Sequence, residues 1–521
     1  MVKQKTVQKS VKRGLSLSLA ILLCFGIVGC SKKPVDTESK TSSAAAIDDS
    51  SVVQGNEDVS GDTESSATGE IQSGTEGNSA SNTGSKQLST SNSSQSASSG
   101  TKLSVVKDLK GRKIKIFQYG YNKEWATNTE VGRQQEELFD KVEKNLNCTI
   151  QIVAGPGDTD FGPIFTSILS GRPSVDIVGT AGPHTLAKPI TTGLYQDLNQ
   201  FAVFNWKGSN WDTDTMKIAN FNGKQYAVFM KLEGYSEAMM NNALFFNKRL
   251  VQKAGYNPND IYKWQENGTW TWDKFKEVAA KISKIEPGKI YGAGGNGYVL
   301  YDNLCVSNDS DWIIRTNDGV IFNAGEAKAL EAGQFYIDLH KEGILSPDDS
   351  SANATQFIAG KLGFLPDVLE RLQYSETYGT MKDDYGVVMI PKGPKAKDYA
   401  SMFNWYGGYA LPTGVQNPAE VASVINAISA SVYPNKAAAN KAATVAQETF
   451  VRDEQSLAVF KMVKTRTVTS AQWLGEPVRT AWLKLIPDIK AGNITLAGAV
   501  SENKDAFADQ IKGTWTFQTK K

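Results

Sequence analysis

Few side chains in this chain are suited to covalent or metal chemistry. The 521 residues include two histidines, His184 and His340, and four cysteines, Cys24, Cys30, Cys148 and Cys305. A His-rich metal site is therefore excluded, and a His-based catalytic triad would depend on one of two residues. The sequence has no G-x-S-x-G, Walker or H-E-x-x-H motif, and Asn308–Asp311 lacks the spacing of a calcium loop. These observations predict a protein without a metal, a cofactor or enzymatic activity.

Cys30 has the sequence context of a processed N-terminus. Basic residues up to Arg13 precede an apolar run from Leu15 to Val28, which is the order of a secretory signal peptide. The run is shorter than the ~20 residues of a membrane-spanning helix. Ile27-Val28-Gly29-Cys30 resembles a bacterial lipobox, which implies a signal peptide of residues 1–29, a diacylglycerol on the Cys30 thiol, and acylation of the new amine, for example by palmitate. An ordinary signal peptide and an uncleaved anchor are the alternatives.

Residues 30–104 have the composition of a tether. Of the 50 residues from 51 to 100, 31 are Ser, Thr, Gly or Asn, and no aromatic residue lies between Phe25 and Phe117. Such a segment cannot bury enough apolar surface to offset its chain entropy, so we expect it to be disordered. Its root-mean-square span would be about 45–50 Å, enough to carry a domain through a thick cell wall. A low-complexity insertion without a function is the alternative.

The charge balance limits the class of partner. The chain has 56 Lys and Arg against 55 Asp and Glu, so no basic excess favours nucleic-acid binding. No later apolar run approaches membrane-spanning length, so we expect the chain after Cys30 to be soluble, at the outer face of the cell membrane. Cys148 and Cys305 are expected to be two buried thiols, with one disulfide as the alternative.

Residues 105–521 have the alternating pattern of an α/β fold. Residues 113–117 and 149–153 alternate polar and apolar side chains, residues 175–179 form a buried apolar run, and helical spacing covers about 131–145. Strand, helix, strand, helix, strand indicates a parallel sheet. Ligands bind such sheets beyond the carboxyl ends of the strands, so the loops after Phe117, Val153 and Val178 are candidates for a site.

Further segments resemble the extracellular solute-binding proteins of ABC importers, in particular family 1, which handles carbohydrates. The strongest is Leu244–Leu250 with Lys253–Tyr256, similar to the family's L-x-Y-N-K-x-L-x-x-x-A-G segment. The ordered set also includes 170–178, 193–198, 271–275, 357–364, 389–393 and 407–412. The resemblance implies two α/β lobes, a hinge and a ligand cleft between the lobes. Lobe 1 would comprise about 105–240 plus part of 390–440, and lobe 2 about 245–390 plus the C-terminal helices.

The resemblance also implies where a sugar would bind, because aromatic rings cover the C–H face of a sugar and polar side chains bond its hydroxyls. The candidates are Trp125 and Asn128 after the first strand, His184 after the third, Tyr235 and Glu237 before the hinge, Asp367, and the aromatic-glycine loop Trp405, Tyr406, Gly407 and Gly408. Asp367 lies in the region of the family's M-x-x-x-G-x-W segment, whose Trp this chain lacks. Packing within a lobe is the alternative role for each.

The resemblance implies a monomeric, lipid-anchored protein that delivers a sugar or oligosaccharide to ABC permease subunits. One alternative is binding of another solute, such as a peptide, or a sensor role without transport. Another is a hydrolase of wall polysaccharide, which would require two carboxylates at catalytic separation. The sequence offers no such pair that we would name.

Overall fold

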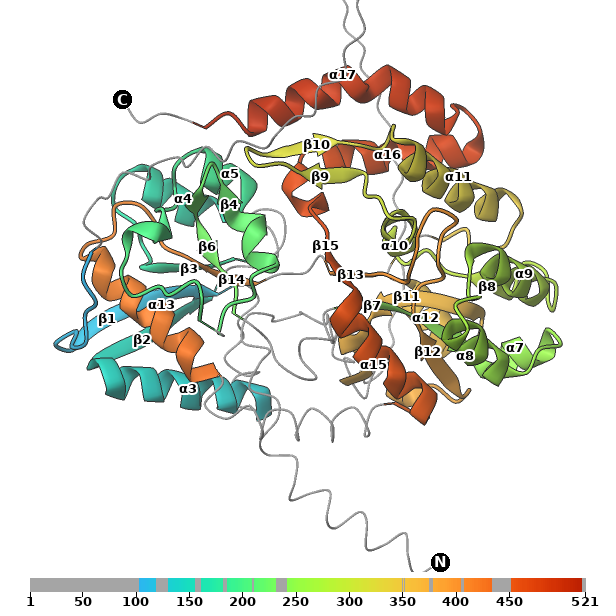
Figure 1. Ribbon diagram of the computed structural model, residues 1–521, viewed down its shortest axis with the longest axis horizontal. Helices are drawn as coiled ribbons and strands as arrows, with labels where there is room; N and C mark the ends of the chain where they lie inside the picture. Colours follow the sequence, from blue (N-terminus) through green and yellow to red (C-terminus); the bar gives the residue numbers. More distant parts are fainter. Residues whose placement is uncertain are drawn as a thin grey trace, which may run out of the picture. The chain divides into compact units, whose positions relative to one another are not determined.

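The computed structural model describes residues 103–118, 130–154, 161–180, 185–208, 210–230, 241–348, 350, 352–373, 378–403, 407–432 and 451–517. Side chains are not described at a few positions within these ranges, including 130–135. Residues 100–521 belong to one compact unit. Within it, two sheets with their own helices define two lobes (Figure 1). Among the described residues, no helix is long and apolar enough to cross a membrane.

Lobe 1 is built on a five-stranded sheet in the order β2-β1-β3-β14-β6. Its strands are β1 (Arg112–Gln118), β2 (Cys148–Ala154), β3 (Ile177–Thr180), β14 (Gly408–Ala410) and β6 (Ala227–Val228). Strands β1, β2 and β3 are parallel, which confirms the sheet expected from the sequence. Strand β14 runs antiparallel to both β3 and β6, so β6 points the same way as β3.

Helices and short elements cover the lobe 1 sheet. They are α3 (Glu130–Leu146), α4 (Gly162–Leu169), α5 (Ala187–Thr191), η3 (Leu198–Gln200), η4 (Thr215–Ala219), the hairpin of β4 (Asn220–Phe221) and β5 (Lys224–Gln225), and α13 (Pro418–Val432). Helix α13 packs against α3, although residues 147–417, which include the lobe 2 sheet, separate them in sequence (Figure 1). The expected amphipathic helix near 131–145 corresponds to α3, whose Leu138, Phe139 and Val142 are buried.

Lobe 2 is built on a four-stranded sheet in the order β12-β7-β11-β8. Its strands are β7 (Asn242–Asn247), β8 (Tyr291–Ala293), β11 (Leu362–Val368) and β12 (Tyr385–Val388), beside a separate hairpin of β9 (Ile313–Arg315) and β10 (Val320–Phe322). Its helices are α7 (Lys248–Lys253), α8 (Pro258–Glu266), α9 (Trp272–Ser283), α10 (Val299–Ser307), α11 (Ala327–Lys341), α12 (Ala352–Ile358), α15 (Glu454–Arg466), α16 (Val478–Ala491) and α17 (Leu496–Thr514), with the short η5 (Leu369–Gln373), η6 (Tyr378–Thr380) and η7 (Gln472–Gly475).

Local sequence signals explain several of these elements. Thr271 caps α9 by accepting from Lys274 N, and Trp272 faces the core with Phe275 and Val278, as expected from their spacing. Trp312 is fully buried and donates its indole N–H to Asp302 Oδ1 at 3.0 Å. Cys148 and Cys305 are buried, unpaired thiols, as expected.

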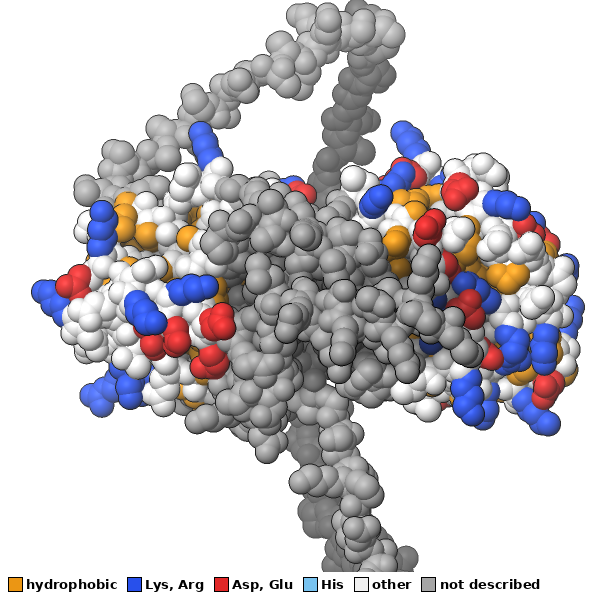
Figure 2. Space-filling view, turned by 90° about the horizontal axis from the view of Figure 1, so that it is seen from below, with side chains coloured by type: hydrophobic (Ala, Val, Ile, Leu, Met, Phe, Trp, Pro, Cys, Tyr) orange, Lys and Arg blue, Asp and Glu red, His pale blue; other side chains and the backbone are white. Residues whose placement is uncertain are grey.

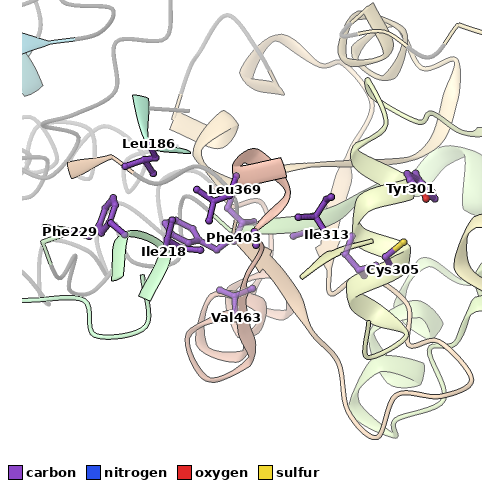
Figure 3. Close-up of a cluster of buried hydrophobic side chains, with 14 of the residues drawn as sticks. Leu186, Ile218, Phe229, Tyr301, Cys305, Ile313, Leu369, Phe403 and Val463 are labelled. Carbon is purple, nitrogen blue, oxygen red and sulfur yellow. The ribbon is translucent and has the colours of Figure 1, made fainter. Parts of the chain in front are cut away.

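The chain passes between the lobes three times, between Met230 and Asn241, between Phe403 and Gly407, and between Val432 and Val451. Strand β13 (Ser401–Phe403) pairs in parallel with β15 (Thr467–Thr469) at the second passage. The buried apolar side chains form one cluster that continues from lobe 1 into lobe 2. Figure 3 shows Phe229 and Ile218 of lobe 1 on one side of Phe403, and Ile313 and Tyr301 of lobe 2 on the other.

Candidate functional site

Most of the segments that contain predicted ligand residues are attached to one edge of the lobe 1 sheet. Strands β1, β2, β3 and β6 all end at this edge, and the antiparallel β14 begins there, because Gly408 pairs with Thr180. We call it the carboxyl edge of lobe 1. Small ligands of α/β proteins bind beyond such an edge, where loops from several strands converge. The topology therefore provides a candidate binding edge before any side chain is considered.

Seven predicted ligand residues lie outside the described residues. They are Trp125, Asn128, His184, Tyr235, Glu237, Trp405 and Tyr406. The described chain nevertheless fixes where their segments attach. Residues 119–129 follow β1 and 181–184 follow β3. Residues 231–240 begin three residues after the end of β6, and 404–406 end two residues before the start of β14. All four segments are thus joined to the carboxyl edge of lobe 1, which is the arrangement that a shared binding site requires.

Gly407 and Gly408 lie among the described residues, and Gly408 has a clear steric role. It is the first residue of β14 rather than a loop residue, which corrects the expectation of an aromatic-glycine loop through Gly408. A Cβ at this position would overlap the carbonyl oxygen of Val228 and lie 2.8 Å from the ring of Phe229. The absence of a side chain allows β14 to fit between β3 and β6.

Two polar residues at this edge were not singled out from the sequence. Gln118 ends β1 and Thr180 ends β3, and their exposed fractions are only 3% and 1%. The Thr180 hydroxyl has no hydrogen-bond partner, which is unusual for a buried polar group. No distinctive sequence pattern marks either residue, because each is a single polar residue at the end of its strand.

The lobe 2 sheet has an equivalent edge. Strands β8, β11 and β12 end there and β7 begins there, because β8 is parallel to β11 and both β11 and β12 are antiparallel to β7. Asp367, predicted as a ligand residue, lies in β11 at this edge, opposite Ala243. The topology therefore places Asp367 beside the passage from lobe 1 into lobe 2.

The Asp367 carboxylate is buried and already has protein partners. Tyr378 Oη donates to Oδ2 at 2.6 Å, and Arg371 Nε lies 3.8 Å from Oδ1. Burial raises the pKa of Asp367, while Arg371 and the Tyr378 hydrogen bond counteract that rise. Asn296, three residues after β8 and in the left-handed conformation, donates its side-chain N–H to the Pro366 carbonyl oxygen at 2.8 Å. The Tyr378 hydrogen bond and the Arg371 ion pair fix the orientation of the Asp367 carboxylate within lobe 2.

Trp473 is a further aromatic residue that the sequence did not single out. It lies in η7, three residues after Ser470, whose N–H donates to the carbonyl oxygen of Phe403. Its half-buried ring carries the Arg479 guanidinium at 4.0 Å from the ring centroid. Ser470 thus ties this part of lobe 2 to Phe403, the last residue before 404–406. Trp473 lies three residues further along the chain.

Neither the surface hollows nor the charged groups elsewhere in the described residues contain the predicted ligand residues or a metal site. Surface hollows of about 430 Å³ beside Trp272 and Phe335, and about 320 Å³ beside Phe322 and Trp515, contain none of the predicted ligand residues. No group of three or more His, Cys, Asp or Glu residues in the described ranges could hold a metal ion. Figure 2 shows Lys and Arg interspersed with Asp and Glu on the face in view, in agreement with the balanced net charge.

Comparison with known proteins agrees with this architecture. Residues 125–431 match the model of the family described as bacterial extracellular solute-binding protein. No curated protein sequence matches the chain.

Solved structures with this fold include a binding protein from Arthrobacter globiformis, described as a cyclic alpha-maltosyl-1,6-maltose binding protein. It is 16% identical, has a TM-score of 0.56, and the match covers 78% of this chain and 99% of that one. The GacH receptor of Streptomyces glaucescens, solved free and with acarbose, is 16% identical with a TM-score of 0.54, over 77% and 99% of the chains. UgpB from Mycobacterium tuberculosis, solved with glycerophosphocholine, is 15% identical with a TM-score of 0.51, over 76% and 98%.

Proposed function

The chain belongs to the bacterial extracellular solute-binding proteins, and we propose that it binds a sugar or oligosaccharide between its lobes and delivers it to an ABC importer. Closure of the lobes on the solute would be a hinge motion, in which the solute shifts an existing equilibrium toward the closed state. No bond of the solute needs to be made or broken. The permease partners would each contact one lobe.

The convergence of candidate segments at the carboxyl edge of lobe 1 is the observation that carries this proposal. These segments bring two Trp and four Tyr residues, whose rings can cover the C–H face of a sugar. They also bring Asn128, His184 and Glu237, and the sheet adds Gln118 and Thr180, all of which can bond hydroxyls. Asp367 and Trp473 are the candidate contributions of lobe 2. The sugar ligands named for two of the structural neighbours favour the same class.

A titration of the full chain tests the sugar assignment. Maltotriose, acarbose and cyclic glucan oligosaccharides would be added separately while tryptophan fluorescence and melting temperature are recorded. We expect at least one of them to raise the melting temperature and change the emission, because binding to the native state stabilises it. If none does, the sugar assignment is wrong. Product analysis of the same mixtures by chromatography tests the non-enzymatic claim, and any cleaved glycan would contradict it.

A non-sugar solute is the second candidate, since the UgpB structure holds glycerophosphocholine on the same fold. Glycerophosphocholine and a tripeptide therefore belong in the same titration. A response to either of them without a response to any sugar would favour this candidate.

We further propose that lipid on Cys30 holds the protein at the outer face of the membrane and that the segment expected to be a tether, residues 31–104, serves as one up to Leu103, where the chain joins lobe 1. Several acyl chains at ~0.8 kcal/mol per buried CH₂ give stable anchoring. The contacts of Leu103 indicate where the tether would join lobe 1. Leu103 N donates to the carbonyl oxygen of Gln200, the last residue of η3, and Leu103 O accepts from Ala202 N. Residue Gln196, just before η3, bonds to Leu411 O beyond the far end of β14. The tether would thus meet lobe 1 away from its carboxyl edge. Metabolic labelling with palmitate, present in the parent and absent in Cys30→Ser, tests the anchor.

A further inference from the structure

We propose that the amino edge of lobe 1, where the chain from the proposed lipid anchor enters the fold, is a contact surface for the anionic headgroups of the membrane. The amino edge is the sheet edge opposite the carboxyl edge, where β1, β2, β3 and β6 begin and β14 ends. The inference rests on the proposed anchor but not on the kind of solute. It concerns a face of lobe 1 that lies away from the candidate binding edge.

The first described segment of the chain runs along the amino edge. At one end, Leu103 N donates to Gln200 O at the end of η3, and the chain just before η3 is bonded to the residue that follows β14. At the other end, Leu109 N donates to Leu146 O, two residues before β2 begins. The segment 103–111 therefore crosses lobe 1 from the end of β14 to the starts of β1 and β2 (Figure 1).

Exposed apolar side chains of lobe 1 are concentrated at this edge. The described residues include six exposed large apolar side chains, and the three in lobe 1 are Leu103, Val105 and Leu169, at 42%, 48% and 67%. Leu169 ends α4, and the loop after it packs against the chain that follows β14, since Gly171 O lies 3.2 Å from the position of a Cβ on Gly414. All three side chains thus belong to the amino edge, where no described residue covers them.

Trp206 adds an aromatic ring with one polar end. Its ring stacks on Phe204 at a centroid distance of 5.0 Å, and its indole N–H donates to Asn199 Oδ1 in η3 at 2.9 Å. The Trp206 side chain is only half-buried, whereas Phe204 and Trp211 beside it are buried. Trp is favoured at membrane interfaces because its ring is apolar and its N–H is polar.

Exposed cations accompany these apolar side chains. Three of them lie within three residues of Val105, Leu169 or Trp206 and form no ion pair with any described residue: Lys107, Arg172 and Lys207. Nearby carboxylates are engaged elsewhere, because Asp176 and Glu420 both bind Arg112, at 2.8 and 2.6 Å. Asp108 accepts from Asn147 Nδ2 at 2.9 Å. The amino edge therefore combines exposed apolar side chains with cations that are free to bind phosphate groups.

The membrane is the partner that these features favour. Surfaces that lie in the interface of anionic bilayers insert apolar side chains at the acyl boundary and place Lys and Arg among the headgroups. Lipid on Cys30 would fix the chain that enters at Leu103 to the same membrane, at an effective concentration of about millimolar. A weak contact is then sufficient to hold the domain near a permease in that membrane. The carboxyl edge, on the opposite side of the sheet, would remain turned toward the solute.

A vesicle assay with a chemical tether tests this surface. The mature chain, residues 30–521, is coupled through Cys30 to a maleimide lipid, while Cys148 and Cys305 are protected because they are buried. The vesicles contain equal parts of phosphatidylglycerol and brominated phosphatidylcholine, whose bromine atoms quench tryptophan near the acyl chains. The tether contains no tryptophan, so quenching reports on the folded domain alone. Vesicles with unbrominated lipid provide the reference emission, and melting temperatures confirm that each variant is folded.

We expect quenching in the coupled parent and about threefold to tenfold less in Trp206→Phe, because Trp206 is the indole placed at the contact. Leu103→Ser combined with Val105→Ser should reduce quenching by a similar factor, since it removes apolar side chains from the interface. Replacing phosphatidylglycerol by phosphatidylcholine should do the same, because it removes the partner of the cations. Ile321→Ser is the matched control: its side chain is 47% exposed on lobe 2, and quenching should not change.

Absence of quenching in the coupled parent would overturn the proposal. Quenching that persists in Trp206→Phe, or that falls equally in Ile321→Ser, would overturn it too, because another face would then contact the bilayer. Dimers detected by crosslinking without any quenching would assign the amino edge to a second copy of the chain instead. Chemical coupling supplies the membrane link, so these results do not depend on acylation of Cys30 in cells, which palmitate labelling tests separately. They are equally independent of the sugar titration.

Discussion

Asn242 Nδ2 donates a 2.9 Å hydrogen bond to the carbonyl oxygen of Met402, and this bond joins two chain segments that lead from one lobe to the other. A second bond runs in return, from Ser401 Oγ to the carbonyl oxygen of Asn242 at 2.7 Å. All the groups involved are buried. The ends of both passages are therefore tied together on the lobe 2 side.

Asn242→Ala should lower the free energy of unfolding by about 1–3 kcal/mol, because it leaves the Met402 carbonyl oxygen buried without its side-chain partner. Urea unfolding followed by circular dichroism measures the change. Asn493→Ala removes a 3.0 Å bond to Asp488 on the surface and serves as the control. Equal effects of the two substitutions would contradict a special role for the buried bond.

Asp311 provides a prediction about pH. Its Oδ2 accepts from Ser470 Oγ at 2.6 Å and its Oδ1 from Gln472 Nε2 at 2.9 Å, and burial raises its pKa to about 6 despite these bonds. The folded state therefore binds the proton more tightly than the unfolded state does. Stability contributed by this group is present below the unfolded pKa of 3.8 and is lost as the pH rises through about 6.

Asp311→Asn should remove this pH-dependent loss while its amide donates to Ser470 Oγ. As the pH rises from 4 to 7, the parent should therefore lose roughly 1–3 kcal/mol of unfolding free energy relative to the variant. Urea unfolding at pH 4.5, 5.5 and 7.5 measures it, with Asp505→Asn on the exposed surface as control. A difference that does not vary with pH would show that Asp311 is ionised normally in the folded state.

Gly408→Ala should disrupt the attachment of β14 to the lobe 1 sheet. The new methyl group would overlap Val228 O, and backbone cannot move aside without breaking the pairing of Tyr409 with Val228. We expect a loss of about 2–3 kcal/mol in the free energy of unfolding. Gly513→Ala in α17 is the matched control, since nothing lies within 4 Å of its added Cβ and helix propensity favours Ala. A Gly408→Ala protein as stable as the parent would refute the steric argument.

Local patterns predicted the parallel part of lobe 1 well. The alternation at 113–117 and 149–153 predicts β1 and β2, although Ile116 and Phe117 of β1 are both buried and Ile150 and Ile152 of β2 are only half-buried. Strand β14 has only three residues, and its conformation depends on pairing with β3 and β6. The local sequence carries no strand pattern there, so Gly408 was predicted to be a loop residue. The ring contact between Phe221 and Trp515 joins residues almost 300 positions apart, and no local sequence pattern predicts such a contact.

The candidate site was predictable to a similar degree. Parallel strands share a carboxyl edge, so the loops after β1 and β3 could be named from the sequence alone. The attachment of 231–240 and 404–406 to the same edge follows only from the pairing of β14 with β3 and β6, which the sequence did not reveal. Thr180 was missed because an isolated threonine at the end of a strand carries no distinctive pattern.

Thr180→Val tests the deepest candidate contact at the carboxyl edge of lobe 1. The substitution nearly preserves shape and removes a buried hydroxyl that has no partner, so stability should be unchanged or rise by about 1 kcal/mol. If that hydroxyl bonds the solute, affinity should fall about tenfold, since a hydrogen bond of typical net strength is lost. Calorimetric titration with the best solute from the panel measures the affinity. Thr191→Val, whose hydroxyl bonds to Ala187 O within α5, is the control and should lose stability but not affinity. Unchanged affinity in a stable Thr180→Val protein would remove Thr180 from the site.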